Sequence, residues 1–246
     1  MKIGILQLGD APFYKQLIGC TTTVSCYAEL HGYDHLPQYP LLDEVGVIYQ
    51  KPYGLLQHIE DYDYIVWMDL DVAIINVEIK LESIITAHPE KEIYYCKDPL
   101  TGRKDIDRPL NAGVLIFKNC QKSIDILKKW WDKCQSGALA PDGSCDQWWL
   151  TCILREMGED EEGLDMTVMN CWAQGFKPGY FICHFMGYHL ADIDAHMQYM
   201  LNNKFATKIM GNYIEAFGKA VPNVLTRKHN NNYTEVLPEE VKRRIV

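Results

Sequence analysis

Two carboxylates follow directly on a run of residues suited to burial. Tyr64–Met68 is continuously apolar, and Asp69 and Asp71 come next. Burying two anions without compensation is very unfavourable, so the pair needs a cation, a helix terminus or water. Carboxylates at positions i and i+2 are well placed to share one hard divalent cation, which also relieves their mutual repulsion. A metal site is therefore one interpretation of the pair.

A second interpretation of the same pair is a phosphatase of the haloacid-dehalogenase type, in which the first aspartate is a nucleophile. Such enzymes usually carry the motif on their first strand, with Thr or Val two residues after the second acid. Here the motif lies further along the chain, and Ala73 stands at that position. The residues therefore disfavour the phosphatase, which stays as an alternative.

The acids need elements that bring them to the edge of a sheet. Apolar runs predict strands at 2–8, 64–68, 92–96, 113–117 and 181–185. Apolar residues at helical intervals predict helices at 13–30, 54–60, 78–87, 123–134, 146–157 and 193–202. Pro37 and Pro40 predict a loop. Strands that alternate with helices indicate an α/β fold with helices on both faces, in which ligands bind beyond the C-terminal ends of the strands.

Four blocks in a fixed order carry a family resemblance: DYIVWMDLDVAIIN at 63–76, LNAGVLIFKNC at 110–120, CDQWWL at 145–150 and ICHFMGYH at 182–189. They resemble the retaining GT-A glycosyltransferases of families 34 and 8, the galactosyl-, xylosyl- and mannosyltransferases. The resemblance implies a Rossmann-like, mixed but mostly parallel sheet in a single domain. It also implies Mn²⁺ (or Mg²⁺), a nucleoside diphosphate sugar donor (UDP-sugar before GDP-sugar) and a glycan or other hydroxyl acceptor.

The resemblance assigns the metal to Asp69, Asp71 and His184, and it places Gly187 near the diphosphate. Two carboxylates and an imidazole leave coordination positions for phosphate oxygens, which suits a Lewis acid that stabilises a departing diphosphate. His184 stands in the apolar run YFICHFMG, so its alternative is a core histidine bonded to the backbone.

The resemblance also assigns positions around the donor sugar. Asn111, Ala112 and Gly113 would contact the sugar and the acceptor, although Gly113 also fits a strand-entry glycine. Asp146 would bond donor hydroxyl groups, with a helix N-cap as its alternative. Gln147 would lie under the anomeric carbon.

Further positions would complete the donor site. Leu8 and Gly9 would contact the nucleotide through their backbone, and Tyr14 would stack on it. Lys51 would be another nucleotide contact. Asp98 is the candidate for a further sugar-binding acid, and Asp105 and Asp107 are its rivals.

One position departs from the family pattern. Members commonly have a lysine five or six residues after the metal-binding histidine, where this chain has His189 and Leu190. A protonated His189 would replace that lysine, although a free imidazole is mostly neutral near pH 7. Lys177 and Arg103 are the other candidates for the diphosphate contact.

The composition of the chain limits its partners. Its 246 residues carry a net charge of −9, which argues against a broad nucleic-acid surface. Nine cysteines occur without C-x-x-C spacing, so we expect reduced thiols rather than a zinc ribbon. No apolar run reaches the length of a membrane span, and the first ten residues do not form a signal peptide. We therefore expect no transmembrane segment and a cytoplasmic location.

The resulting prediction is a metal-dependent glycosyltransferase that acts with retention of configuration. One domain would span residues 1–246, with a nucleotide-sugar-binding half at 1–110, an acceptor and catalytic half at 111–205 and an extension at 206–246. The alternative from another class is a non-catalytic module that binds nucleotide sugars. The intact Asp-x-Asp and Asp-Gln pairs argue against this module, and the missing lysine argues for it.

Overall fold

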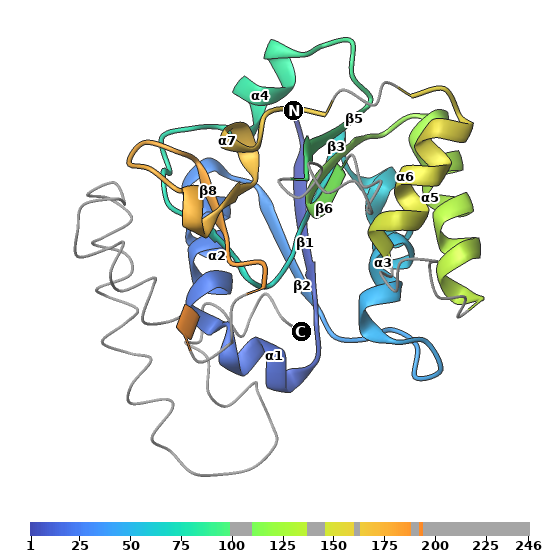
Figure 1. Cartoon of the computed structure of the whole chain (residues 1–246), viewed down its shortest axis with the longest axis horizontal. Helices are drawn as coiled ribbons and strands as arrows, with labels where there is room; N and C mark the ends of the chain where they lie inside the picture. Colours follow the sequence, from blue (N-terminus) through green and yellow to red (C-terminus); the bar gives the residue numbers. More distant parts are fainter. Residues whose placement is uncertain (99–109, 137–145, 160–162, 188–191, 194–246) are drawn as a thin grey trace.

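A twisted five-stranded sheet forms the centre of the computed structural model, which describes residues 1–98, 110–136, 146–159, 163–187 and 192–193 (Figure 1). In spatial order its strands are β2 (Asp34–Gln38), β1 (Ile3–Leu8), β3 (Tyr64–Met68), β6 (Leu110–Lys118) and β5 (Ile93–Lys97). β1 runs parallel to β2 and β3, whereas β6 runs antiparallel to β3 and β5. β6 is thus the one reversed strand of this sheet. This arrangement confirms the predicted α/β fold with a mixed, mostly parallel sheet.

A smaller sheet lies beside the central one and consists of β4 (Val72–Ile74), β8 (Ile182–His184) and β7 (Cys171–Trp172). β4 is antiparallel to β8, and β7 is parallel to β8. The chain passes from β3 to β4 through a tight turn, in which the N–H of Val72 donates to the carbonyl of Asp69 at 3.2 Å. The two acids therefore stand where the chain leaves the central sheet for the smaller one.

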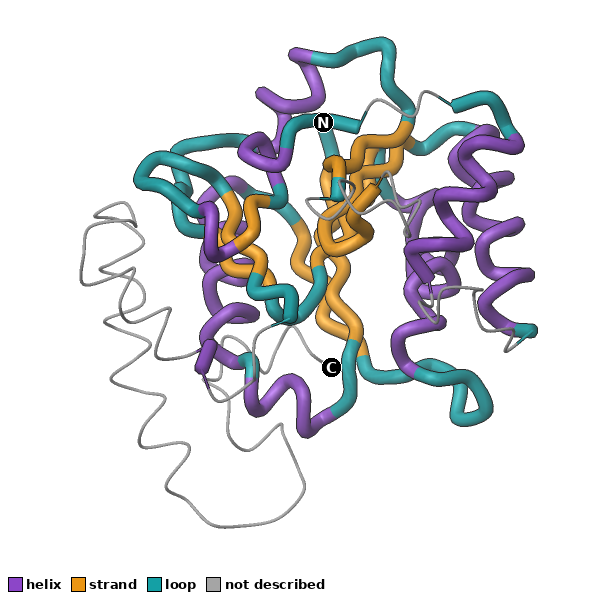
Figure 2. The backbone as a smooth tube through the Cα atoms, in the orientation of Figure 1, coloured by secondary structure: helices purple, strands orange, loops and turns teal. Residues whose placement is uncertain are grey.

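Helices cover both faces of the central sheet (Figure 2). α2 (Ile18–His31) lies on the face that also carries the smaller sheet, whereas α3 (Lys51–His58), α5 (Gln121–Gln135) and α6 (Asp146–Glu156) lie on the other (Figure 1). The shorter helices are α1 (Ala11–Gln16), α4 (Leu81–Ala87), α7 (Met166–Met169) and three 3₁₀ turns at Val47–Gln50, Ile59–Asp61 and Ala173–Gly175.

Burial on both faces explains why β3 is continuously apolar. Val66 and Met68 pack into the cluster that contains Tyr27 of α2. Ile65 and Trp67 pack into the opposite cluster, with residues of α3 and α5. The prediction of this strand is confirmed at both ends.

The loop predicted around Pro37 and Pro40 is only partly right. Pro37 lies inside β2, and Pro40 lies after it. β2 is an edge strand, and proline is tolerated there because one side of the strand makes no ladder hydrogen bonds. A proline alone therefore misled the sequence-based prediction.

The predicted helix at 13–30 is two helices, which join at Leu17. α1 begins earlier than predicted because the carboxylate of Asp10 accepts from the N–H of Phe13 at 3.0 Å, as an N-cap does. α2 ends at Gly32, whose φ of 72° is left-handed and suits glycine. α3 and β6 also begin earlier than predicted, at Lys51 and Leu110. The helix predicted at 193–202 lies outside the described residues, apart from Ile193.

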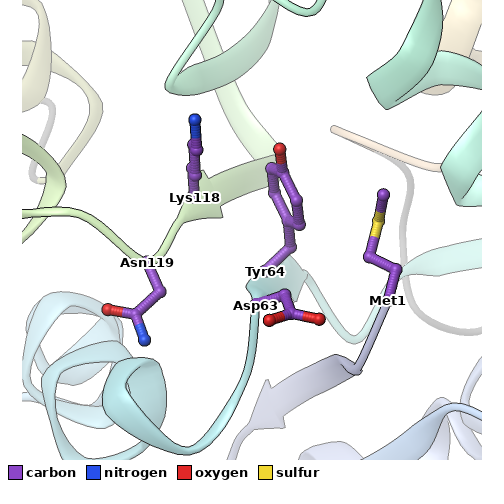
Figure 3. Close-up of a pocket in the computed structure, with 5 residues that line it drawn as sticks. All are labelled: Met1, Asp63, Tyr64, Lys118 and Asn119. Carbon is purple, nitrogen blue, oxygen red and sulfur yellow. The ribbon is translucent and has the colours of Figure 1, made fainter.

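A cavity of about 360 Å³ opens at the end of β3 and β6 that lies away from the two acids (Figure 3). Its lining consists of Met1, Asp63, Tyr64, Lys118 and Asn119. Tyr64 is the first residue of β3 and Lys118 the last of β6, and the two are register partners. None of the predicted site residues that the structure describes lines this cavity. Within the described part of the chain, no helix combines the length and the apolar character that a membrane crossing requires.

Candidate active site

Three strand ends converge at the predicted site. Asp69 follows the last residue of β3, and its N–H donates to the carbonyl of Gly113 in β6 at 2.8 Å. Because β6 is antiparallel to β3, the beginning of β6 lies at the same edge as the end of β3. The pairing of β4 with β8 places Val72 opposite His184. Residues distant in sequence therefore meet beside the Asp-x-Asp turn.

Asp69, Asp71 and His184 form a group that suits a divalent cation. Each offers one ligand atom, and these atoms lie within 4.8 Å of one another. The Nε2 atom of His184 lies 3.3 Å from Oδ1 of Asp71, and its Nδ1 atom lies 2.9 Å from Oδ1 of Asn170. Both ring nitrogens thus face side chains, which disagrees with the alternative of a core histidine bonded to the backbone. Two carboxylates and one imidazole fit Mn²⁺ or Mg²⁺.

Asp71 and His184 each shift the other's pKa. Burial raises the pKa of Asp71, but the neighbouring imidazole lowers it more, so the pKa lies below its ordinary value. Burial lowers the pKa of His184, but the carboxylates of Asp71 and Asp69 outweigh it, so the pKa lies above its ordinary value. The two side chains thus favour each other's charged forms, and a cation that binds the imidazole must displace a proton from it wherever the ring is charged.

Among the residues that the structure describes, Lys51 supplies a fixed cation at the site. Its buried Nζ atom lies 3.0 Å from Oδ1 of Asp69 and 2.7 Å from Oδ2 of Asp146, and it donates to the carbonyl of Ala112 at 2.9 Å. Three oxygens thus match the three donors of an ammonium group. Burial lowers the pKa of Lys51, but the two carboxylates outweigh it and raise the pKa, so the ammonium stays charged. The predicted nucleotide contact of Lys51 stays a prediction.

Trp67 gives Asp69 a second donor, from the same strand. Its indole N–H donates to Oδ1 of Asp69 at 2.6 Å, and the ammonium of Lys51 lies 5.0 Å from its ring centroid. Burial raises the pKa of Asp69, and Lys51 offsets this only in part, so the pKa stays above its ordinary value. The sequence contained a signal for Trp67, because residues two apart in a strand lie on one face.

Gln147 links two of the other predicted positions. Its side-chain oxygen accepts from the N–H of Ala112 at 3.1 Å, and its amide nitrogen donates to Oδ2 of Asp98 at 2.7 Å. Asp98 is buried, and the structure brings it together with the first turn of α6. Its rivals Asp105 and Asp107 lie outside the described residues.

Two glycines allow this close packing. A Cβ atom on Gly113 would overlap Cε1 of His184 and lie 2.6 Å from its Nδ1 atom. A Cβ atom on Gly9 would overlap the side chain of Leu70, the residue between the two acids. Gly113 lies inside β6, so the alternative of a strand-entry glycine is wrong. Its lack of a side chain makes room for the imidazole.

Comparisons with known proteins concern the fold. No protein-family model matches the chain, and neither does any curated protein sequence. A glycosyltransferase involved in the glycosylation of the major capsid of PBCV-1 is similar in structure, with a TM-score of 0.63 and 19% identity over 81% of this chain and 100% of that chain. The chain has a GT-A-like glycosyltransferase fold.

Further solved structures show the same GT-A-like fold. The galactosyltransferase LgtC, in complex with donor and acceptor sugar analogues, matches with a TM-score of 0.53 and 12% identity over 98% of this chain and 100% of that chain. The glycosyltransferase GlyE of Streptococcus pneumoniae matches with a TM-score of 0.52 and 12% identity over 89% of this chain and 64% of that chain. This fold, with the acids after an inner strand, argues against the phosphatase alternative.

Three of the four predicted nucleotide contacts, Leu8, Gly9 and Tyr14, lie next to β1 and β2. Tyr14 is buried, and its hydroxyl donates to the carbonyl of Gln7 and accepts from the N–H of Gln38 at 3.0 Å. The backbone N–H of Gly9 donates to the carbonyl of Gln38 at 3.1 Å, and Leu8 pairs with Gln38 in register. Stacking by Tyr14 and backbone contacts by Leu8 and Gly9 stay predictions.

The phosphate side of the site is only partly described. Gly187 follows β8 with a left-handed φ of 75°. His189 and Arg103 lie outside the described residues, and Lys177 is exposed. The replacement of the family lysine therefore stays a prediction.

Asn170 is a site residue that the sequence analysis missed. It is fully buried between α7 and β7, and it bonds the side chains of Asn111 and His184. Its signal in the sequence was a single amide between Met169 and Cys171, in the run MTVMNCWA. Only the pairing of β7 with β8 reveals what this amide faces.

Proposed function

We propose that this chain is a metal-dependent glycosyltransferase that transfers a sugar from a nucleoside diphosphate sugar to a hydroxyl group of an acceptor, with retention of configuration. The observation that carries the proposal is the convergence of Asp69, Asp71 and His184 at the edge where Gln147 and Asp98 also meet. UDP-sugars are the favoured donors and GDP-sugars the second choice. Mn²⁺ is the favoured cation, with Mg²⁺ as the alternative.

The three ligands would hold the cation beside the donor's diphosphate. When bound there, the cation supplies Lewis acidity that stabilises the charge on the departing diphosphate. Lys51 keeps Asp69 and Asp146 in place, and its own positive charge adds to the field at the leaving group. Asp146 and Gln147 would orient the sugar hydroxyls at the face that reacts.

The surroundings of the sugar-binding acids favour front-face attack. Asp98 accepts from Gln147 and Asp146 pairs with Lys51, so both carboxylates are held by neighbouring side chains. The amide of Gln147 is a poor nucleophile. In the proposed step the bond from the acceptor oxygen to the anomeric carbon forms as the bond to the phosphate oxygen breaks. The hydroxyl proton passes to the leaving diphosphate.

The test is the release of nucleoside diphosphate from a panel of UDP- and GDP-sugars, with Mn²⁺, with Mg²⁺ and with a chelator. The proposal expects metal-dependent release with at least one donor, and Asp71→Ala as the inactive control. Binding of a donor without any release, across the panel and a set of glycan acceptors, would contradict it and favour the non-catalytic module.

A further inference from the structure

Buried hydrogen bonds connect the backbone of β6 to the imidazole of His184 through two amide side chains. The N–H of Gly113 donates to Oδ1 of Asn111 at 2.9 Å. The amide of Asn170 donates to the same oxygen at 2.7 Å. The other end of this amide, Oδ1 of Asn170, lies 2.9 Å from Nδ1 of His184. All these side chains are buried, so water does not replace these bonds.

The direction of every bond in this relay follows from its first member. A backbone N–H only donates, so Asn111 must turn its oxygen toward Gly113. That oxygen only accepts, so Asn170 must turn its amino group toward Asn111. The oxygen of Asn170 then faces His184, and it too only accepts. This acceptor favours the proton of a neutral His184 on Nδ1, which leaves the lone pair of Nε2 bare.

The bare nitrogen is the one that faces the acids. Nε2 of His184 lies 3.3 Å from Oδ1 of Asp71, within the group that suits a cation. With the opposite tautomer, Nε2 would carry the proton, donate to Asp71 and be closed to a metal ion. The contact of Nδ1 with the fully buried Asn170, at 2.9 Å, is shorter than the 3.3 Å contact of Nε2 with the partly exposed Asp71. A bare Nδ1 facing a bare buried oxygen therefore disfavours that tautomer.

We propose that Asn170 is a positioning residue that fixes the ring and the tautomer of His184 for metal binding, and that takes its own orientation from Gly113 through Asn111. This inference rests on the proposed metal site and adds to it a residue outside the ligand set. It also joins the segment Asn111–Gly113, assigned to the sugar, to the metal ligand through direct bonds.

The backbone around Asn170 supports this role. Its N–H donates to the carbonyl of Met166 at 2.9 Å, so the last turn of α7 holds the residue in place. β7 begins at the next residue and pairs with β8, with Trp172 opposite His184. The imidazole packs closely on Gly113, where an added Cβ atom would overlap the ring. The outer partners of metal-binding histidines typically orient the ring in this way.

The first test is the tautomer of His184 in the metal-free wild-type protein without nucleotide, at a pH above the raised pKa of the imidazole, where the ring is neutral. Long-range ¹⁵N–¹H correlation spectra of histidine-labelled protein separate the two neutral tautomers, and His184→Asn assigns the signal. The proposal expects the proton on Nδ1. A proton on Nε2 would overturn it. Because neither metal nor donor is present, this result is independent of whether the chain transfers sugar.

The second test compares two variants, one that removes the acceptor facing Nδ1 and one that keeps it. Asn170→Leu removes the acceptor, so we expect loss of the preference for the Nδ1 proton and Mn²⁺ affinity weaker by about 10–100-fold. Asn170→Asp keeps an acceptor for Nδ1, removes the donor to Asn111 and adds a carboxylate charge, so we expect its neutral tautomer to match the wild type. A folded Asn170→Leu with wild-type tautomer and Mn²⁺ affinity would overturn the proposal. If that variant does not fold, loss of the tautomer preference in Asn170→Asp overturns it.

Discussion

Asp69 and Asp71 belong to the same three-residue motif, but different cations neutralise them. Their side chains are similarly accessible, at 31% and 27%, so exposure does not distinguish them. Asp69 faces an ammonium and an indole N–H, both permanent donors at neutral pH. Asp71 faces an imidazole, which can release its proton, unlike the ammonium of Lys51. Asp69 is thus held by permanent partners of the folded protein, whereas Asp71 pairs with a side chain that a metal ion can also bind.

The difference shows why one motif supports two tasks. The pair formed by Lys51 and Asp69 stabilises the folded chain whether or not a metal is present. The pair formed by Asp71 and His184 gives up its proton when a metal binds. Substitutions of the residues that neutralise Asp69 should therefore affect stability and geometry. Substitutions around Asp71 and His184 should affect metal affinity.

Lys51→Met should give the largest effect, because it removes the ammonium that neutralises Asp69. It leaves Asp69 and Asp146 as poorly compensated carboxylates, which costs about 3–5 kcal/mol of unfolding free energy. Urea denaturation measures the loss. Lys122→Met is the control, because this exposed lysine also pairs with two acids and should cost no more than about 1 kcal/mol. Equal losses in the two variants would contradict the central role of Lys51.

Gln147→Ala should lower turnover by up to about 100-fold, with little change in donor affinity. The amide holds Asp98 and the backbone of Ala112 in register with α6. Steady-state kinetics and donor titration by calorimetry separate the two effects. The exposed Gln121 provides a control, and Gln121→Ala should behave as the wild type. Unchanged turnover in Gln147→Ala would remove this residue from the reactive face.

Gly113→Ala should disturb the pair of Asp71 and His184, because the added methyl group would displace the imidazole of His184. Overpacking of this kind costs about 1–3 kcal/mol, and we expect weaker Mn²⁺ binding as well. Thermal unfolding and Mn²⁺ titration measure the two effects. Gly175→Ala is the matched control, because nothing lies within 4 Å of its added Cβ atom and its φ is not left-handed. A Gly113→Ala variant that binds Mn²⁺ as tightly as the wild type would contradict the packing argument.

The smallest expected effect is the pH dependence of Mn²⁺ affinity, which distinguishes the imidazole partner of Asp71 from the ammonium partner of Asp69. The pKa of His184 is raised by Asp71, so the proton competes with the metal over a range that begins above the ordinary histidine pKa. As the pH falls below this raised value, Mn²⁺ affinity should fall about tenfold per pH unit, because one proton must leave for each ion bound. Calorimetry in several buffers gives the proton count. A flat profile would exclude His184 as a ligand.

The sequence predicted those parts of the site that depend on local pattern. Tyr64–Met68 was predicted at both ends, because a strand buried on both faces has an unbroken apolar run. The GT-A-like fold followed from motif order. The partners of Lys51 did not, because its three oxygens come from the turn after β3, from β6 and from α6, which only the tertiary structure brings together.

The dependence on tertiary structure also explains the other features that the sequence analysis predicted wrongly or did not predict. A reversed β6 explains why Asn111 lies at the site although it begins a strand, and local pattern does not reveal strand direction. Pro37 was read as a loop residue because edge position is a property of the sheet, not of the residue. Asn170 was missed because its only distinctive feature is what surrounds it.

The most direct test of the account is a calorimetric titration of the metal-free protein with Mn²⁺ in the presence of UDP, for the wild type and Asp71→Ala. The account predicts one Mn²⁺ site in the wild type and its loss in a variant that still unfolds cooperatively. Wild-type affinity in Asp71→Ala, or no Mn²⁺ binding by the wild type, would contradict it.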